Sequence, residues 1–196
     1  MRLVLASTSP RRKELLEQVG AVFSQLKIDI NEDVRLGESP EAYVLRLAEE
    51  KAAAGFQQLT RQQQQECVVL AADTTVVCDG NILTKPESLA DSQKILGQLS
   101  GREHQVITAI GLHSADSRHK KLVLTHVTFR QLDETEIEAY WHTGEPQDKA
   151  GSYGIQGLAA IFVESIRGSY SNVVGLPLCE TAELLKQFDI PLWQDK

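Results

Sequence analysis

The feature that most constrains the fold is a run of apolar residues near the middle of the chain, at positions 67–72 (CVVLAA). Such an uninterrupted run is typical of a strand buried on both faces in the centre of a sheet. We expect this strand to break at Asp73 and Thr74 and to resume over 75–78. A carboxylate that ends a buried strand, where ligands often bind, requires a cation, a metal ion or a reacting water. The alternative is an aspartate that serves a turn or a helix cap.

Short strand patterns alternate with helix patterns on both sides of this run. We expect strands at 3–6, 22–28, 104–114, 121–130 and 161–166, and helices that begin after Ser9, Ser39 and Asp133 and span 88–99 and 176–188. The sequence Asp79-Gly80-Asn81 indicates a hairpin turn. Since we find no internal repeat or linker, we expect one continuous α/β domain over 1–196, with two lobes facing a cleft.

Composition excludes several classes of partner. The formal net charge of −7 argues against general binding to nucleic acid, so an anionic substrate would need a local basic cluster. Three widely spaced cysteines, Cys67, Cys78 and Cys179, suggest buried free thiols and a reducing cytoplasm. The N-terminus does not resemble a signal peptide, and no apolar run approaches the ~20 residues of a membrane helix. We therefore expect a soluble cytoplasmic protein without a membrane partner.

The segment 7–12 (STSPRR) is the first candidate for a binding site. It brings hydroxyl groups and two guanidinium groups to the junction between a strand and a helix N-terminus. Free backbone N–H groups and the helix dipole favour a phosphate at such a junction, and the forked donors of Arg11 and Arg12 match phosphate oxygens. The alternative is a simple helix cap by Ser9 followed by two solvated arginines.

Other candidates are weaker when taken one at a time. Lys85, held before Pro86, could serve as a point charge on phosphate, or it could be a solvated lysine; the same choice applies to Glu32 and Lys51. A glycine-rich stretch at 151–157 permits close approach of the backbone to a ligand, and its Gln156 could read a base edge, although a flexible loop is the alternative. No P-loop and no paired histidine motif is present.

The order of these motifs closely resembles the Maf family of nucleotide pyrophosphatases. The resemblance covers nearly the whole chain, from Leu3 to about Leu185, and rests on 5–12 (LASTSPRR), Glu32, Arg46-Leu47-Ala48 with Lys51, 72–74 (ADT), Lys85-Pro86, 151–157 (GSYGIQG) and 175–177 (GLP). It implies an elongated mixed sheet flanked by helices, with two lobes around a deep cleft. It also implies a requirement for a divalent cation such as Mg²⁺ or Mn²⁺, and frequently a homodimer.

The resemblance implies a role for each matching residue. Asp73 matches the catalytic proton acceptor, and Glu32 matches an acidic residue that helps to hold the metal ion or the water. The polar and basic set around the phosphates is matched by Ser7, Arg11, Arg12, Lys51 and Lys85. An activated water would attack the α-phosphorus and pyrophosphate would leave, with the metal drawing off charge. Asp73 as base and Asp73 as metal ligand both stay open.

The resemblance also implies a substrate. Members similar to the dTTP/UTP group carry arginine, threonine and glutamine at three specificity positions, which here are Arg11, Thr74 and Gln156. Members similar to the 7-methyl-GTP group carry tryptophan, glutamine and glutamate, which suits a cationic base. We therefore expect pyrimidine nucleotides as substrates: dTTP and UTP, and in addition CTP or modified pyrimidine nucleotides.

Two alternatives belong to different classes. An inosine or xanthosine triphosphate pyrophosphatase would also begin with a strand and a basic helix, but such enzymes open with a Thr-x-Asn pattern in place of 7–12 (STSPRR). A nucleotide-binding regulator of septum formation, with little catalysis, is suggested by the family's link to septum formation and growth arrest. The joint presence of Glu32, Lys51, Asp73 and Lys85 argues against a pure binder.

Overall fold

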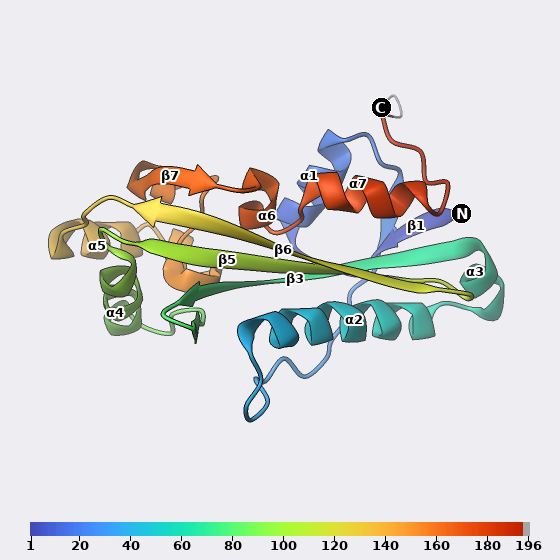
Figure 1. The fold of residues 1–196 in the computed structure, drawn as a ribbon, viewed down its shortest axis with the longest axis horizontal. Coiled ribbons are helices and arrows are strands. Elements are labelled where there is room, and N and C mark those ends of the chain that lie inside the picture. Colours follow the sequence, from blue (N-terminus) through green and yellow to red (C-terminus); the bar gives the residue numbers. More distant parts are fainter. Residues whose placement is uncertain (194–196) are drawn as a thin grey trace. The chain divides into compact units, whose positions relative to one another are not determined.

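The computed structural model describes residues 1–193, which fold into two compact units. The first unit contains Met1–Asp73, Thr108–Val123 and the chain from Gly175 onward; the second contains Thr74–Ile107 and Leu124–Val174. The mixed sheet has seven strands, in the order β2-β1-β3-β5-β6-β7, with β4 paired to β3 (Figure 1). The α/β class and the division into two lobes are therefore as the sequence predicts.

The first unit begins with parallel strands linked by helices. Strand β1 (Arg2–Leu5) is parallel to both β2 (Phe23–Gln25) and β3 (Cys67–Cys78). Parallel neighbours need crossover connections, which are supplied by α1 (Pro10–Gln18) and α2 (Pro40–Gln58). The predicted second strand over 22–28 is shorter in the structure, because only three of its residues pair with β1.

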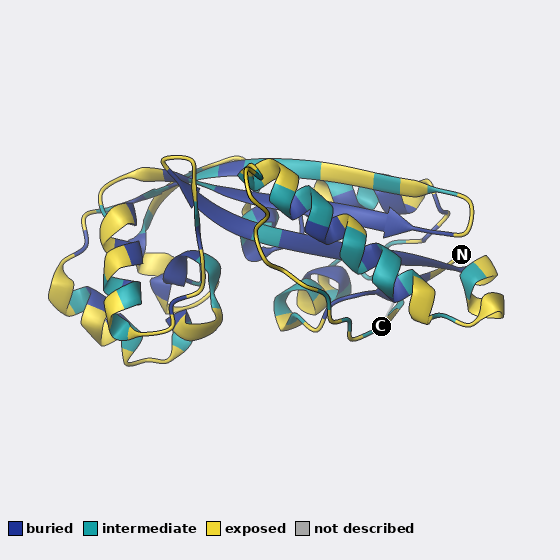
Figure 2. Cartoon of the chain, turned by 90° about the horizontal axis from the view of Figure 1, so that it is seen from below, coloured by how far each residue is buried: buried dark blue, intermediate teal, exposed yellow. Residues whose placement is uncertain are grey.

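Strand β3 corrects one prediction. It runs without interruption over twelve residues, so Asp73 lies within the strand and does not end it. Its residues from Cys67 to Ala72 are all buried, as in a central strand. The long strands in the middle of the sheet are largely coloured as buried in Figure 2. The predicted break is absent because Lys51 pairs with the buried carboxylate of Asp73, and because the β-branched Thr74 and Thr75 favour an extended backbone.

Helix α2 packs unusually close to the strands of the first unit. Its start is fixed by Ser39, whose hydroxyl accepts a hydrogen bond from the amide of Ala42. A Cβ atom added at Gly55 would lie 2.9 Å from the Cβ of Ala6, and one added at Gly111 would lie 2.8 Å from the carbonyl oxygen of Ala48. The two glycines therefore allow the close approach that brings side chains of α2 onto the sheet. Two further helices of this unit are α3 (Arg61–Glu66) and α7 (Leu178–Lys186).

The second unit contains a hairpin and an aromatic core. Asp79 and Gly80 form its two-residue turn with φ values of 51° and 77°, which confirms the predicted hairpin into β4 (Asn81–Leu83). The rings of Phe129 and Tyr153 lie 4.7 Å apart between centroids, and those of Tyr140 and Phe162 lie 5.0 Å apart. The other elements that lie in this unit are α4 (Leu89–Leu99), α5 (Glu134–Trp141), η1 (Glu145–Asp148), η2 (Ala150–Ser152), η3 (Leu158–Phe162), β7 (Val163–Arg167) and α6 (Tyr170–Val174).

The long strands β5 (Glu103–His113) and β6 (Arg118–Phe129), like β3, contribute residues to both units. Antiparallel pairing of β6 with β7 completes the mixed sheet. No helix within residues 1–193 has the length and the hydropathy that a membrane span requires.

Two smaller predictions were wrong. Cys179 is exposed, whereas Cys67 and Cys78 are buried as expected. The reason is that the buried face of α7 is formed by Thr181, Leu184 and Leu185, and Cys179 lies off that face in the first turn. Ser9 occupies the N-cap position of α1, but its side chain makes no capping hydrogen bond.

The close approach of α2 gives a first prediction. Gly111→Ala would force the new methyl group against the backbone of Ala48, and we expect it to lower the free energy of unfolding by about 1–3 kcal/mol. The matched control is Gly97→Ala in α4, where an added Cβ would have no heavy atom within 4 Å. This substitution should raise the free energy of unfolding by about 1 kcal/mol. Urea unfolding followed by circular dichroism measures both, and equal effects of the two substitutions would contradict this account of the helix packing.

Candidate active site

The turn that follows β1 is organised by Ser7 and Arg12. The hydroxyl oxygen of Ser7 accepts hydrogen bonds from the amide of Ser9 at 3.2 Å and from Nη1 of Arg12 at 3.3 Å. Nε of Arg12 donates to the carbonyl oxygen of Gly175 at 2.9 Å, which ties the start of α1 to the segment before α7. Arg12 is therefore a fixed, partly buried cation, and the alternative of two solvated arginines is wrong for this residue.

Arg11 and Arg12 are adjacent in the first turn of α1, and both are half-buried. Burial lowers the pKa of Arg12, with the nearby charge of Arg11 acting in the same direction and that of Asp73 opposing it. Two neighbouring guanidinium groups at a helix N-terminus offer forked hydrogen-bond donors beside backbone amides, so this turn is suited to hold phosphate oxygens.

Lys51 brings the two acidic candidates together. Its ammonium nitrogen donates to Oδ1 of Asp73 at 2.7 Å and forms an ion pair with Oε1 of Glu32, also at 2.7 Å. The side chains of Asp73 and Lys51 are 9% and 13% exposed, whereas that of Glu32 is 54% exposed. One cation thus links a buried carboxylate to a carboxylate that solvent can reach.

The electrostatics of Asp73 suit proton transfer. Burial raises the pKa of Asp73 above its usual range, while the charges of Lys51 and Arg12 oppose that rise. A carboxylate with a raised pKa is a stronger base than one on the surface, and perturbed carboxylates of this kind are frequent in active sites.

Asp73 and Glu32 are also the pair that could hold a metal ion. Within residues 1–193 there is no cluster of three or more histidine, cysteine or acidic side chains with a geometry for metal binding. Two carboxylates on a shared cation nevertheless fit Mg²⁺ or Mn²⁺, because Mg²⁺ is commonly held by one or two carboxylates together with the phosphate oxygens of a substrate.

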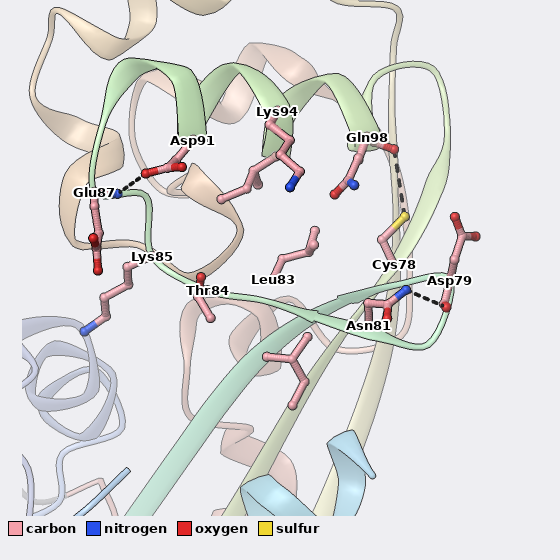
Figure 3. A pocket seen from close by; sticks show the side chains of 12 residues that line it. Cys78, Asp79, Asn81, Leu83, Thr84, Lys85, Glu87, Asp91, Lys94 and Gln98 are labelled. Carbon is pink, nitrogen blue, oxygen red and sulfur yellow. Dashed lines mark hydrogen bonds between the residues drawn. The ribbon is translucent and has the colours of Figure 1, made fainter. Parts of the chain in front are cut away.

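The remaining predicted site residues lie in the second unit. Thr74 follows Asp73 in β3 and is half-buried. Lys85 is exposed beside the buried Pro86 and lines a cavity of about 400 Å³ between β4 and α4. In Figure 3 the Lys85 side chain extends away from the α4 side chains Lys94 and Gln98. The structure therefore brings Ser7, Arg12, Glu32, Lys51 and Asp73 together within one unit and positions Thr74, Lys85 and Gln156 within the other.

The start of the glycine-rich stretch packs against other elements of its unit. Gly151 has φ 71° and fits against Val76, where an added Cβ would lie 2.8 Å from the side chain. Ser152 is fully buried and shares a 2.7 Å hydrogen bond with Ser92. These contacts leave Gln156 exposed at the tip of a loop whose base is anchored in the core.

Glu145 also contributes to this region, a role that was not predicted from the sequence. Its carboxylate accepts hydrogen bonds from the hydroxyl of Tyr140 at 2.7 Å and from the amides of Leu158 and Ala159 at 2.8 and 3.3 Å. Burial alone would raise the pKa of Glu145, but these hydrogen bonds outweigh burial and lower it. Glu145 therefore anchors the backbone just after Gln156, and no local pattern around position 145 signals this.

The chain is similar to known proteins over nearly its whole length. A model of the family described as Maf-like protein matches residues 2–188. A dTTP/UTP pyrophosphatase of Hahella chejuensis (strain KCTC 2396) is 53% identical over 194 residues, covering 99% of this chain and 96% of that protein. A dTTP/UTP pyrophosphatase of Vibrio vulnificus (strain YJ016) is 52% identical and covers 95% of this chain and 98% of that protein.

Among solved structures, the Staphylococcus aureus Ham1 protein matches with a TM-score of 0.39 and 14% identity, covering 68% of this chain and 73% of that chain. This likeness is too distant to bear on the chemistry of the site.

The anchored loop gives a prediction for stability against pH. His104 shares a 2.9 Å hydrogen bond with the hydroxyl of Tyr153, and burial lowers the pKa of His104 to about 4. In the unfolded state the imidazole takes up a proton below about pH 6.5, whereas in the folded state it stays neutral down to about pH 4. His104 therefore leaves the free energy of unfolding unchanged above pH 6.5 and lowers it progressively as the pH falls towards 4. We expect a loss of about 3 kcal/mol across this window.

Urea unfolding between pH 7 and pH 4.5 measures this loss. His104→Gln can keep a hydrogen bond to Tyr153 but cannot titrate, so its stability should fall less with pH than that of the wild type. The exposed His142→Gln serves as the control and should follow the wild type. The same pH dependence in all three proteins would refute the role of His104.

Proposed function

Because this chain belongs to the family of Maf-like proteins, we propose that it is a nucleoside triphosphate pyrophosphatase that hydrolyses dTTP and UTP to the monophosphate and pyrophosphate. The observation that carries the proposal is the buried Asp73, paired through Lys51 with Glu32, in the same unit as the Ser7–Arg12 turn. A base and a phosphate cradle are the two parts that hydrolysis of a triphosphate requires.

In this proposal the turn at the start of α1 binds the phosphates. Ser7 and the α1 backbone amides donate hydrogen bonds, and Arg11 and Arg12 neutralise charge on the phosphate oxygens. Arg12 is already oriented by Gly175 and Ser7, so little side-chain freedom is lost when the substrate binds. Lys85, in the second unit, would add a further point charge on the phosphates.

Asp73 accepts the proton from the water that attacks the α-phosphorus. Burial raises the pKa of Asp73, so its carboxylate is a stronger proton acceptor, while the charge of Lys51 opposes that rise and its hydrogen bond orients the carboxylate. Glu32 shares Lys51 and is exposed enough to contact the water or a cation. Pyrophosphate leaves with its charge held by the cationic side chains.

A divalent cation, Mg²⁺ or Mn²⁺, is part of the proposal. Asp73 and Glu32 would hold it, and when bound it would supply charge withdrawal from the phosphate oxygens. Asp73 then has two possible roles, as base or as ligand that lowers the pKa of the water, and the contacts of its carboxylate are compatible with both.

Substrate choice is assigned to Arg11, Thr74 and Gln156. A pyrimidine edge with carbonyl acceptors beside an N–H is suited by a guanidinium group and by an amide that both donates and accepts. The exposed position of Gln156 on an anchored loop supports a contact with the base. CTP and modified pyrimidine nucleotides belong to the same substrate class.

We also propose a homodimer in the cytoplasm. The dimer rests on the family, and the cytoplasmic setting is supported by three cysteines that are free in the described chain. Inosine triphosphate hydrolysis and a regulatory role in septum formation are the competing functions that the nucleotide assay below distinguishes.

The reaction is tested with purified protein, Mg²⁺ or Mn²⁺, and a panel of dTTP, UTP, CTP, dUTP, GTP, 7-methyl-GTP and ITP, with products resolved by ion exchange. We expect monophosphate and pyrophosphate from dTTP and UTP. Asp73→Asn should lower kcat at least about 100-fold because it removes the proton acceptor. The exposed Asp116→Asn is the control and should leave kcat unchanged. Turnover of ITP alone would refute the pyrimidine assignment, and no turnover at all would favour the regulator.

The specificity assignment is tested at Gln156. Gln156→Glu removes the amide donor and adds an acceptor, so we expect kcat/KM for dTTP and UTP to fall by about 10–100-fold, with a relative gain for 7-methyl-GTP. The control Gln147→Glu adds the same charge at another exposed position of the second unit and should leave the preference among nucleotides unchanged. An unaltered ratio between the nucleotides in Gln156→Glu would count against a role for Gln156 in base recognition.

A further inference from the structure

The segment that carries Glu32 has no regular structure of its own. Residues 26–39 lie between β2 and α2 and contain neither helix nor strand (Figure 1). Most of the residues around Glu32 are exposed, and Leu36 near the end of the segment is fully exposed. A loop of this kind would move freely, yet Glu32 meets Lys51 at 2.7 Å, so other contacts must limit its conformations.

Tyr43 supplies the first of these contacts. It lies in the first turns of α2, and its hydroxyl donates a hydrogen bond of 3.0 Å to the backbone carbonyl oxygen of Glu32 itself. The hydrogen bond acts on the main chain, so it fixes the origin of the Glu32 side chain and leaves the carboxylate free for Lys51.

Arg46 supplies the second contact, one turn further along α2. Its guanidinium group donates through Nε and Nη2 to the two carboxylate oxygens of Glu38, at 2.6 and 2.7 Å. Nη2 also donates to the carbonyl oxygen of Asp33 at 3.0 Å. The side chains of Arg46 and Glu38 are only 12% and 9% exposed, so this forked ion pair is shielded from water. The hydrogen bond from Arg46 lowers the pKa of Glu38 to about 2, which keeps the pair ionised at neutral pH.

The side chains of Tyr43 and Arg46 also contact each other. The guanidinium carbon of Arg46 lies 5.6 Å from the centroid of the Tyr43 ring, so each side chain restricts the other. Together they hold the carbonyl oxygens of two successive residues, Glu32 and Asp33, and the end of the loop at Glu38. Arg35 contacts α2 through its side chain at Glu50, and its backbone amide donates to Oε2 of Glu38 at 3.0 Å.

We infer that Tyr43 and Arg46 are positioning residues that hold the Glu32 backbone so that its carboxylate faces Lys51 and Asp73; the inference rests on the proposed function for its effect on turnover. Tyr43, Arg46 and Lys51 all belong to α2. The helix therefore sets both the position of the ammonium group and the position of the loop that brings the second carboxylate to it.

The test uses Tyr43→Phe and Arg46→Lys, each alone and combined with Glu32→Gln. Tyr43→Phe loses only the hydroxyl group. Arg46→Lys keeps a positive charge beside Glu38 but cannot form the two parallel hydrogen bonds of the guanidinium group. Lys120→Gln is the matched control, because it removes an exposed ion pair between β6 and Glu49 of α2 without touching the loop. The measurements are kcat and KM for dTTP, thermal unfolding, and amide hydrogen exchange of a peptide covering 29–38.

We expect each positioning variant to lower kcat by about 10–100-fold, as small displacements of reacting groups do, with KM changed less. Exchange over 29–38 should accelerate while exchange elsewhere and the unfolding temperature stay near those of Lys120→Gln. In the Glu32→Gln background the same substitutions should cause less than a further ~2-fold loss, because they act through Glu32.

Three results would overturn the inference: an equal loss of kcat in both backgrounds, unchanged exchange over 29–38, or accelerated exchange with unchanged kcat. Failure of the proposed function is recognised separately. If the wild-type protein hydrolyses no nucleotide of the panel, the function is wrong; the exchange measurement then still decides whether Tyr43 and Arg46 hold the loop.

Discussion

The ion pairs of Lys51 are the interaction on which the site and much of the first unit depend. A carboxylate inside a central strand is costly, and here the cost is offset by an ammonium group on the helix that covers the strand. The same ammonium group reaches a second carboxylate from a loop. One lysine thus allows a buried acid within a continuous strand, because glycines at positions 55 and 111 let α2 approach closely enough.

Much of the architecture could be predicted from local pattern. Apolar runs identified the central strand, and the turn at Asp79 and Gly80 was predicted from residue types that tolerate positive φ. The break expected at Asp73 was wrong because a local pattern contains no information on a partner 22 residues away. The short helix α6 was not predicted either, since its position depends on Asn172, whose side-chain amide bonds the Val106 carbonyl and the Thr125 hydroxyl.

The candidate site, too, divides into residues that local sequence motifs predict and residues whose roles depend on distant contacts. Residue type and motif order predict a site formed by Ser7, Arg11, Arg12, Glu32, Lys51 and Asp73, and the structure shows Lys51 in contact with both acids. Glu145, Tyr43 and Glu38 could not be assigned roles, because each acts on the backbone of a distant loop through hydrogen bonds. Such contacts depend on tertiary structure, and residues that act through them resemble ordinary surface positions in a sequence.

The continuity of β3 has a consequence for how the chemistry is encoded. Side chains alternate between the faces of a strand, so Cys67, Val69 and Ala71 share a face with Asp73, and the first three belong to the apolar cluster that includes Ala52 of α2. A slip of one residue in the pairing with β1 would turn Asp73 away from Lys51 and bring an alanine or a threonine in its place. The alignment of two hydrogen-bonded strands therefore decides which side chain of β3 faces Lys51, and the apolar row on the α2 face stabilises that alignment.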